Sequence, residues 1–178
     1  DLDTGVDWRH PDLWFADGGT FTYVNATSTG FLNGTDAVDL NNDTALSPDE
    51  VLFALDLDHN GTFEVTTEWL WVDSVTQNGI PDIGEPFFVV NDTNGNNLLD
   101  GFEQLIMLGT PKTRYIVEMD GDSSSPELQV WDREENLTIS THSDTSLNGG
   151  GHGTAVAGIL VGGQIGFRSW VELHQVRN

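Results

Sequence analysis

The sequence contains no cysteine, few basic residues and no long apolar segment. Without cysteine, neither disulfides nor thiol chemistry can contribute to stability or catalysis. Six Lys and Arg stand against 29 Asp and Glu, and the formal net charge of −23 at pH 7 excludes nucleic acids and anionic membranes as partners through repulsion. The longest apolar runs have five or six residues, whereas a transmembrane helix needs about 20, so we expect no membrane span.

The acidity predicts cations as ligands. Two interpretations stay open, namely calcium sites built from carboxylates and a solvated acidic surface of the kind found in salt-adapted proteins. A chain of 178 residues can form one core, or one domain that carries a large insertion.

The asparagines lie in an unusual number of N-glycosylation sequons. Asn-x-Thr occurs six times, at Asn25, Asn33, Asn42, Asn60, Asn91 and Asn136. This pattern predicts an exported glycoprotein, extracellular or at the cell surface; the alternative is that Asn, Gly and Thr are common in turns. Two of the six fall within the metal loops proposed below, so the N-glycans are expected on Asn25, Asn33, Asn91 and Asn136.

The middle of the chain holds an internal repeat between residues 39 and 108. Four polar segments begin at Asp39, Asp56, Ser74 and Asp92, and each is followed by a short apolar run, "VLFAL", "WLWV", "PFFVV" or "QLIML". We name these segments loops 1 to 4. Their Asp, Asn and Gly residues match the spacing of twelve-residue calcium loops, in which positions 1, 3, 5, 7, 9 and 12 supply oxygen ligands.

Loops 1 and 4 fit this pattern at every ligand position. Loop 2 fits it up to position 9, but its position 12 is Thr67 and Glu68 comes one residue late, so a one-residue bulge is needed. The predicted ligands are Asp39, Asn41, Asp43, the Ala45 carbonyl, Ser47 and Glu50 in loop 1; Asp56, Asp58, Asn60, the Thr62 carbonyl and Glu64 in loop 2; and Asp92, Asn94, Asn96, the Leu98 carbonyl, Asp100 and Glu103 in loop 4.

Loop 3 is the exception. It keeps Asn78, Gly79, Asp82 and Glu85 but starts with Ser74 and has no acid at its third position, so we predict weak calcium binding there or none. For every loop the alternative is a metal-free turn, because Asp, Asn and Gly bend chains without an ion.

The four segments resemble the calcium loops of the EF-hand, dockerin and thrombospondin type 3 families, and the resemblance implies calcium as the ligand. The runs between them are too short for the flanking helices of an EF-hand. Because runs such as "EWLWV" and "FFVV" are aromatic and β-branched, they predict short strands or single turns. "RYIVEMD" and "ELQVWD", further along the chain, also predict strands.

The two ends of the chain carry a second pattern. The chain opens with "DLDTGVDWRHPDL" and contains "GHGTAVAGIL" near its other end. Together these motifs resemble the subtilase family of serine peptidases, which implies Asp3 and His152 as the catalytic aspartate and histidine. Asp12, in "HPDL", matches a position at which family members bind structural calcium.

The resemblance also implies a mechanism and a fold. His152 would act as general base toward a serine hydroxyl, and Asp3 would orient its imidazole. We expect an α/β subtilisin-like core, only partly present, formed by residues 1–16 and 146–178 with a helix from Gly153 to about Val161. A mainly β or irregular calcium-binding insertion is expected over 17–145, because Asp3 and His152 are much further apart than is usual in the family.

The sequence contains no G-T-S-x-A-x-P serine motif. The prediction is therefore a fragment of an exported, calcium-stabilised serine endopeptidase that acts on peptides or proteins once the remaining part of the protease domain is supplied. As it stands, the chain is expected to be inactive. The alternative is a calcium-rigidified, glycosylated surface or filament protein that self-assembles and retains protease motifs as relics.

Overall fold

The computed structural model describes residues 10–82, 84–120, 127–135, 156–159 and 173–177. The chain divides into two compact units. The terminal unit comprises Asp1–Phe15, Thr110–Gly163 and Arg168–Asn178, and the central unit comprises Ala16–Gly109 and Gln164–Phe167. All four repeat loops lie in the central unit; the predicted extent of the insertion stays a prediction.

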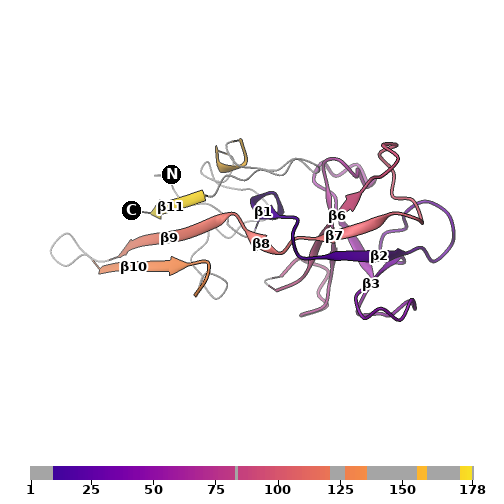
Figure 1. Cartoon of the computed structure of the whole chain (residues 1–178), viewed down its shortest axis with the longest axis horizontal. Helices are drawn as coiled ribbons and strands as arrows, with labels where there is room; N and C mark the ends of the chain where they lie inside the picture. The colour runs from indigo at the N-terminus through magenta and orange to yellow at the C-terminus, as the bar shows by residue number, and fades with distance from the viewer. Residues whose placement is uncertain (1–9, 83, 121–126, 136–155, 160–172, 178) are drawn as a thin grey trace. The chain divides into compact units, whose positions relative to one another are not determined.

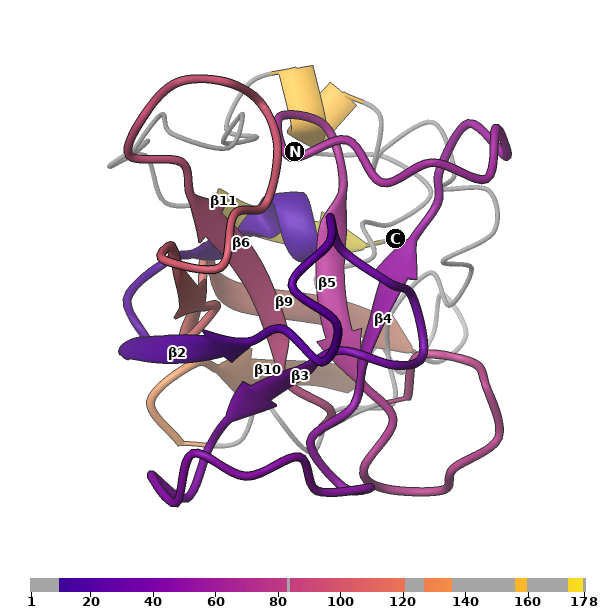
Figure 2. The ribbon, with the colours of Figure 1, turned by 90° about the vertical axis from the view of Figure 1, so that its right-hand side faces the viewer.

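The central unit is a six-stranded antiparallel sheet. Its strands lie in the order β3-β2-β7-β6-β5-β4, and each is short, as the apolar runs predicted (Figure 2). Their bounds are Thr20–Val24 for β2, Ala37–Asp39 for β3, Leu52–Leu55 for β4, Trp69–Val72 for β5, Phe87–Asn91 for β6 and Gln104–Met107 for β7.

The two outer strands of this sheet meet and close it. Ala37, in β3, forms an antiparallel bridge with Val51, just before β4. The Leu52 amide donates to the Asp36 carbonyl at 2.8 Å. Strands that are consecutive in the chain are therefore neighbours around a small barrel, with β7 beside β2. Closure leaves no long unpaired edge on which another chain could add a strand.

Each repeat loop joins two consecutive strands of this barrel. Because the strands run antiparallel, successive loops alternate between its two ends. Figure 2 shows this directly, with loops 1 and 3 at the lower end of the view and loops 2 and 4 at the upper end. The repeat in the sequence is thus a repeat of strand followed by loop.

The core of the barrel is apolar and follows the period of two expected for strands. In β5, Leu70 and Val72 belong to the central cluster, while Trp69 and Trp71 are buried on the opposite face. The Trp71 ring packs on Phe53 with centroids 5.4 Å apart. The buried cluster consists of Tyr23, Val38, Leu52, Val65, Leu70, Val72, Phe88, Val90, Leu99 and Leu105.

The terminal unit is built from elements that lie before and after the central unit in the sequence (Figure 1). The 3-10 helix η1 (Pro11–Leu13) leads into β1 (Trp14–Phe15), which pairs with β8 (Thr110–Pro111). Strand β9 (Thr113–Asp120) pairs antiparallel with β10 (Glu127–Asp132) and parallel with β11 (Leu173–Arg177). Residues 156–159 are helical.

The expected α/β subtilisin-like core is wrong as a description of this fold. Strands account for 31% of the structure and helix for only 6%, because the chain is dominated by aromatic and β-branched runs of four or five residues between polar turns. The short strands predicted after each loop, and those at "RYIVEMD" and "ELQVWD", are confirmed. Of the helix expected from Gly153 to Val161, only 156–159 falls within the described residues. Among those residues, no helix is long and apolar enough to cross a membrane.

Candidate functional site

The four repeat loops share one backbone arrangement that begins with an aspartate at the end of a strand. Asp39 ends β3, and Asp56, Asp73 and Asp92 directly follow β4, β5 and β6. In each loop, an amide five or six residues further along donates to this aspartate. The four bonds are Thr44 to Asp39 at 3.1 Å, Gly61 to Asp56 at 2.8 Å, Gly79 to Asp73 at 2.7 Å and Asn97 to Asp92 at 2.9 Å.

Each loop also contains a pair of residues with positive φ that are separated by one residue, and loop 3 has a further one at Gly84. The pairs are Asn42 and Thr44, His59 and Gly61, Gln77 and Gly79, and Gly95 and Asn97. Thr44 has a φ of 60°, which is an outlier for a β-branched residue and costs about 1–3 kcal/mol. The hydrogen bonds of the loop therefore impose a conformation that the local sequence does not prefer.

A buried glutamate closes every loop. Its Oε1 accepts from an amide near the start of the same loop, and the four bonds are Leu40 to Glu50 at 2.9 Å, Leu57 to Glu68 at 2.8 Å, Val75 to Glu85 at 3.1 Å and Thr93 to Glu103 at 2.9 Å. Loop 2 thus closes on Glu68 instead of Thr67, through the expected one-residue bulge. Loop 3 begins at Asp73, which does not match a twelve-residue pattern because the extra residue of loop 3 lies between Asp73 and Gly79, six residues apart, whereas Gly61 follows Asp56 by five.

The charge of these loops is not balanced within their unit. Residues 16–109 contain eleven Asp and five Glu but no Lys or Arg. The closing glutamates are nonetheless buried, with exposed fractions of 3% for Glu50, 2% for Glu68, 7% for Glu85 and 2% for Glu103. Backbone amides donate to both carboxylate oxygens of Glu68, Glu85 and Glu103. Glu50 Oε2 is buried and has no hydrogen-bond partner within the described part of the chain, so a bound cation could offset its desolvation cost.

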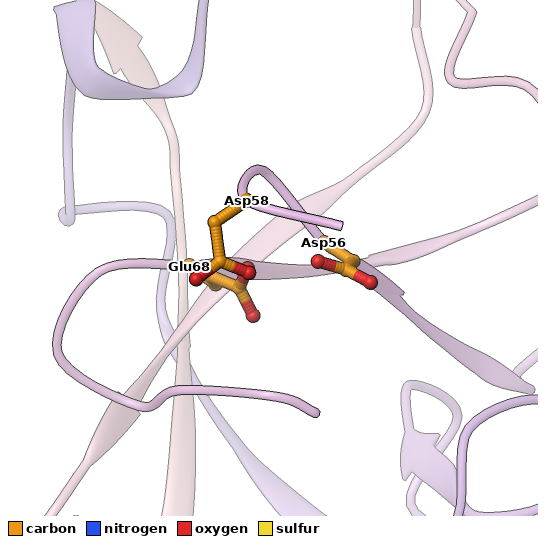
Figure 3. Close-up of side chains that lie close together, drawn as sticks. All are labelled: Asp56, Asp58 and Glu68. Carbon is orange, nitrogen blue, oxygen red and sulfur yellow. The ribbon is translucent and has the colours of Figure 1, made fainter. Parts of the chain in front are cut away.

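Loop 2 brings its carboxylates closest together. Oxygens of Asp56, Asp58 and Glu68 lie within 4.8 Å of one another, and Figure 3 shows the three side chains close together. Burial raises the pKa of Glu68 above its usual value, and the carboxylates of Glu64 and Asp56 raise it further, against backbone hydrogen bonds that lower it. Such an all-oxygen cluster could hold a metal ion of the calcium type.

The predicted ligands of loop 4 also converge. The Asp100 carboxylate accepts bonds from the Asn94 and Asn96 side chains, both at 2.8 Å. In loop 1, the Asn41 side chain donates to Asp43 at 3.1 Å, and in loop 2 the Asn60 side chain donates to Glu64 at 2.8 Å. The roles of Ser47 and of the carbonyls of Ala45, Thr62 and Leu98 stay predictions.

In the terminal unit, Asp12 lies in η1 beside a buried lysine. The ammonium of Lys112, which is 2% exposed, donates to the Asp12 carbonyl at 2.9 Å. Burial raises the pKa of the Asp12 carboxyl, and the charges of Lys112 and His10 lower it in part. Burial likewise lowers the pKa of Lys112, opposed by Asp12. A positive charge therefore already stands beside the predicted calcium ligand.

Asp12 also lies next to the second protease motif. A β-carbon on Gly158 would be 3.7 Å from Asp12 Oδ2, so Asp12 and Gly158 are neighbours in space although they stand at opposite ends of the sequence. Ala157, which precedes Gly158 in the helical turn, is fully buried. The predicted catalytic residues Asp3 and His152 lie outside the described residues.

Comparison with known proteins identifies the family of the chain. The model of the subtilase family matches residues 2–172. Searches of curated proteins and of solved structures gave no match. Because the family match spans nearly the whole chain, including both motifs and the barrel between them, the chain belongs to the subtilase family.

Proposed function

We propose that these residues form part of an exported, calcium-stabilised serine endopeptidase of the subtilisin type. The observation that carries this proposal is the family match, and the closeness of Gly158 to the Asp12 carboxylate supports it.

In this proposal, His152 takes the proton of a serine hydroxyl as the hydroxyl attacks the substrate carbonyl, and then delivers that proton to the leaving amine. Asp3 accepts a hydrogen bond from the other imidazole nitrogen, which fixes the tautomer and stabilises the imidazolium. The serine comes from a part of the protein outside these 178 residues, and the substrate is a peptide or protein.

Calcium has a structural role in this account. Loops 1, 2 and 4 would hold it through the carboxylates at their first and last positions, with Glu68 as the closing ligand of loop 2. Support comes from the buried glutamates and from the absence of Lys and Arg between residues 16 and 109. Glu50 adds a specific observation, because its Oε2 is buried and has no hydrogen-bond partner within the described part of the chain. For Asp12, by contrast, Lys112 already supplies a positive charge.

Export and glycosylation belong to the same proposal. Asn33 and Asn91 are exposed, as a glycan requires. Asn25 is half-buried and its side-chain amide donates to the Thr29 carbonyl at 2.5 Å, so we propose it as the less accessible site. Asn136 lies outside the described residues.

The test is hydrolysis of a denatured protein substrate by the full-length protein. Asp3→Asn is expected to lower kcat by about 10⁴-fold, because loss of the orienting carboxylate leaves the histidine in the wrong tautomer. Full activity in this variant, or no hydrolysis by the unmodified protein, would contradict the enzymatic function. The second outcome would favour a calcium-rigidified, self-assembling surface protein.

A further inference from the structure

We propose that loop 3, which the sequence pattern predicted to bind weakly or not at all, is a further calcium site formed by Asp73, Asn78, Asp82 and Glu85. This inference extends the calcium part of the proposed function to a loop that it does not include. It follows from the position of Asp73, which directly follows β5 as Asp56 and Asp92 follow β4 and β6.

The strongest observation is an oxygen without a partner. Asp73 is 9% exposed, and its Oδ2 accepts the Gly79 amide at 2.7 Å. Its Oδ1 is buried and has no hydrogen-bond partner within the described part of the chain. An unpaired buried carboxylate oxygen carries a desolvation penalty, and a bound cation removes that penalty because it supplies the missing positive partner.

Other polar side chains of loop 3 are hydrogen-bonded within the loop, although among the described residues only Asp56, Asp58 and Glu68 bring three carboxylate oxygens within 4.8 Å of one another. Asp82 accepts from the Asn78 side chain at 2.9 Å and from the Thr76 hydroxyl. Glu85, which is 7% exposed, accepts the Asp82 amide at 2.8 Å through Oε2. The Asp82 and Glu85 carboxylates each keep lone pairs for a metal ion, since a carboxylate accepts about four bonds and each accepts two here.

Charge does not distinguish loop 3 from the loops that fit the pattern. Asp73, Asp82 and Glu85 give three carboxylates, and loop 4 has three in Asp92, Asp100 and Glu103. The ligands are all oxygens on a flexible loop, which suits calcium better than the strictly octahedral magnesium ion. What hides the site in the sequence is one extra residue, because the amide that binds the first aspartate lies six residues away in loop 3 and five in the other loops.

The experiment counts calcium ions by native mass spectrometry on the full-length protein. Asp73→Asn is expected to bind one ion fewer than the unmodified protein. Asp92→Asn, in loop 4, should also lose one ion. Asp49→Asn, an exposed residue of loop 1 outside the ligand positions, should lose none and serves as the matched control.

The outcomes separate this inference from the proposed function. An unchanged count in Asp73→Asn, with one ion lost in Asp92→Asn, overturns the loop 3 site alone. An unchanged count in both variants contradicts calcium binding by loop 4 as well. If Asp73→Asn does not fold, as judged by near-ultraviolet circular dichroism, Asp82→Asn replaces it in the test. We expect the Kd of the weakest calcium-binding step to be at least tenfold higher in Asp82→Asn than in the unmodified protein. An unchanged calcium titration overturns the site.

Discussion

Asp12 and Gly158 come from the two protease motifs, and a β-carbon on Gly158 would lie 3.7 Å from the Asp12 carboxylate. This is an ordinary contact distance, so the helical turn has room for a methyl group and for little more. The relationship links sequence segments at opposite ends of the chain.

Gly158→Ala should keep the fold and raise the free energy of unfolding by about 0.5 kcal/mol, because alanine loses less entropy than glycine in a helix. Gly158→Leu should lower it by about 1–3 kcal/mol through overpacking against Asp12. Urea unfolding of both variants measures the difference. Equal stability of the two would show that the segments do not pack together.

Removal of calcium should destabilise the barrel. Close carboxylates repel one another once the ion leaves, and a site held at about 100 times its Kd contributes about 2.7 kcal/mol. With several sites, EDTA is expected to lower Tm by about 10 °C or more. Added calcium should restore the original Tm and magnesium should not. A Tm that does not respond to EDTA would contradict calcium binding by all four loops.

A buried hydrogen-bond network holds the segment between β2 and β3. Tyr23 donates to Asp36 Oδ2 at 2.5 Å, and the amides of Leu32 and Ala26 donate to the same carboxylate at 2.7 and 2.9 Å. Tyr23→Phe should cost about 1–3 kcal/mol, since Asp36 is fully buried and would lose a donor. Thr22→Ser, at an exposed neighbour, should change stability by less than about 0.5 kcal/mol. Similar losses in both variants would contradict this role.

The His10 imidazole should make the terminal unit sensitive to acid. Its Nδ1 accepts the Asp12 amide at 3.3 Å, and burial lowers the pKa of His10 below the usual 6.5, opposed by Asp12. Between the pKa of His10 in the folded protein and 6.5, the unfolded chain binds more protons than the folded one. The contribution of neutral His10 to the free energy of unfolding is therefore complete above pH 6.5 and is lost as the pH falls through this window.

The measurement is Tm against pH at saturating calcium, with the His10 pKa followed by NMR. His10→Asn is the matched control, because the asparagine oxygen can accept the same amide but does not titrate. It should show a flatter profile between pH 7 and 5. A His10 pKa above 6.5 would contradict the proposed environment.

Part of this architecture could be predicted from the sequence. The strands after each loop follow from aromatic and β-branched runs, and three of the four loops follow from the spacing of their Asp, Asn and Glu residues. Barrel closure could not be predicted, because the Ala37–Val51 bridge and the pairing of β2 with β7 depend on distant segments. Asp73 was missed because a one-residue insertion shifts the register of loop 3. The α/β core was predicted from two motifs and is wrong, because strands account for 31% of the structure and helix for only 6%.

The most direct test of the central claim is labelling of the full-length protein with a fluorophosphonate, which reacts with an activated serine. The unmodified protein and His59→Asn, an exposed residue of loop 2, are expected to be labelled, and His152→Ala is expected to remain unlabelled because it lacks the base that activates the serine. Absence of labelling in the unmodified protein, or equal labelling of His152→Ala, would contradict the assignment of this chain to a serine endopeptidase.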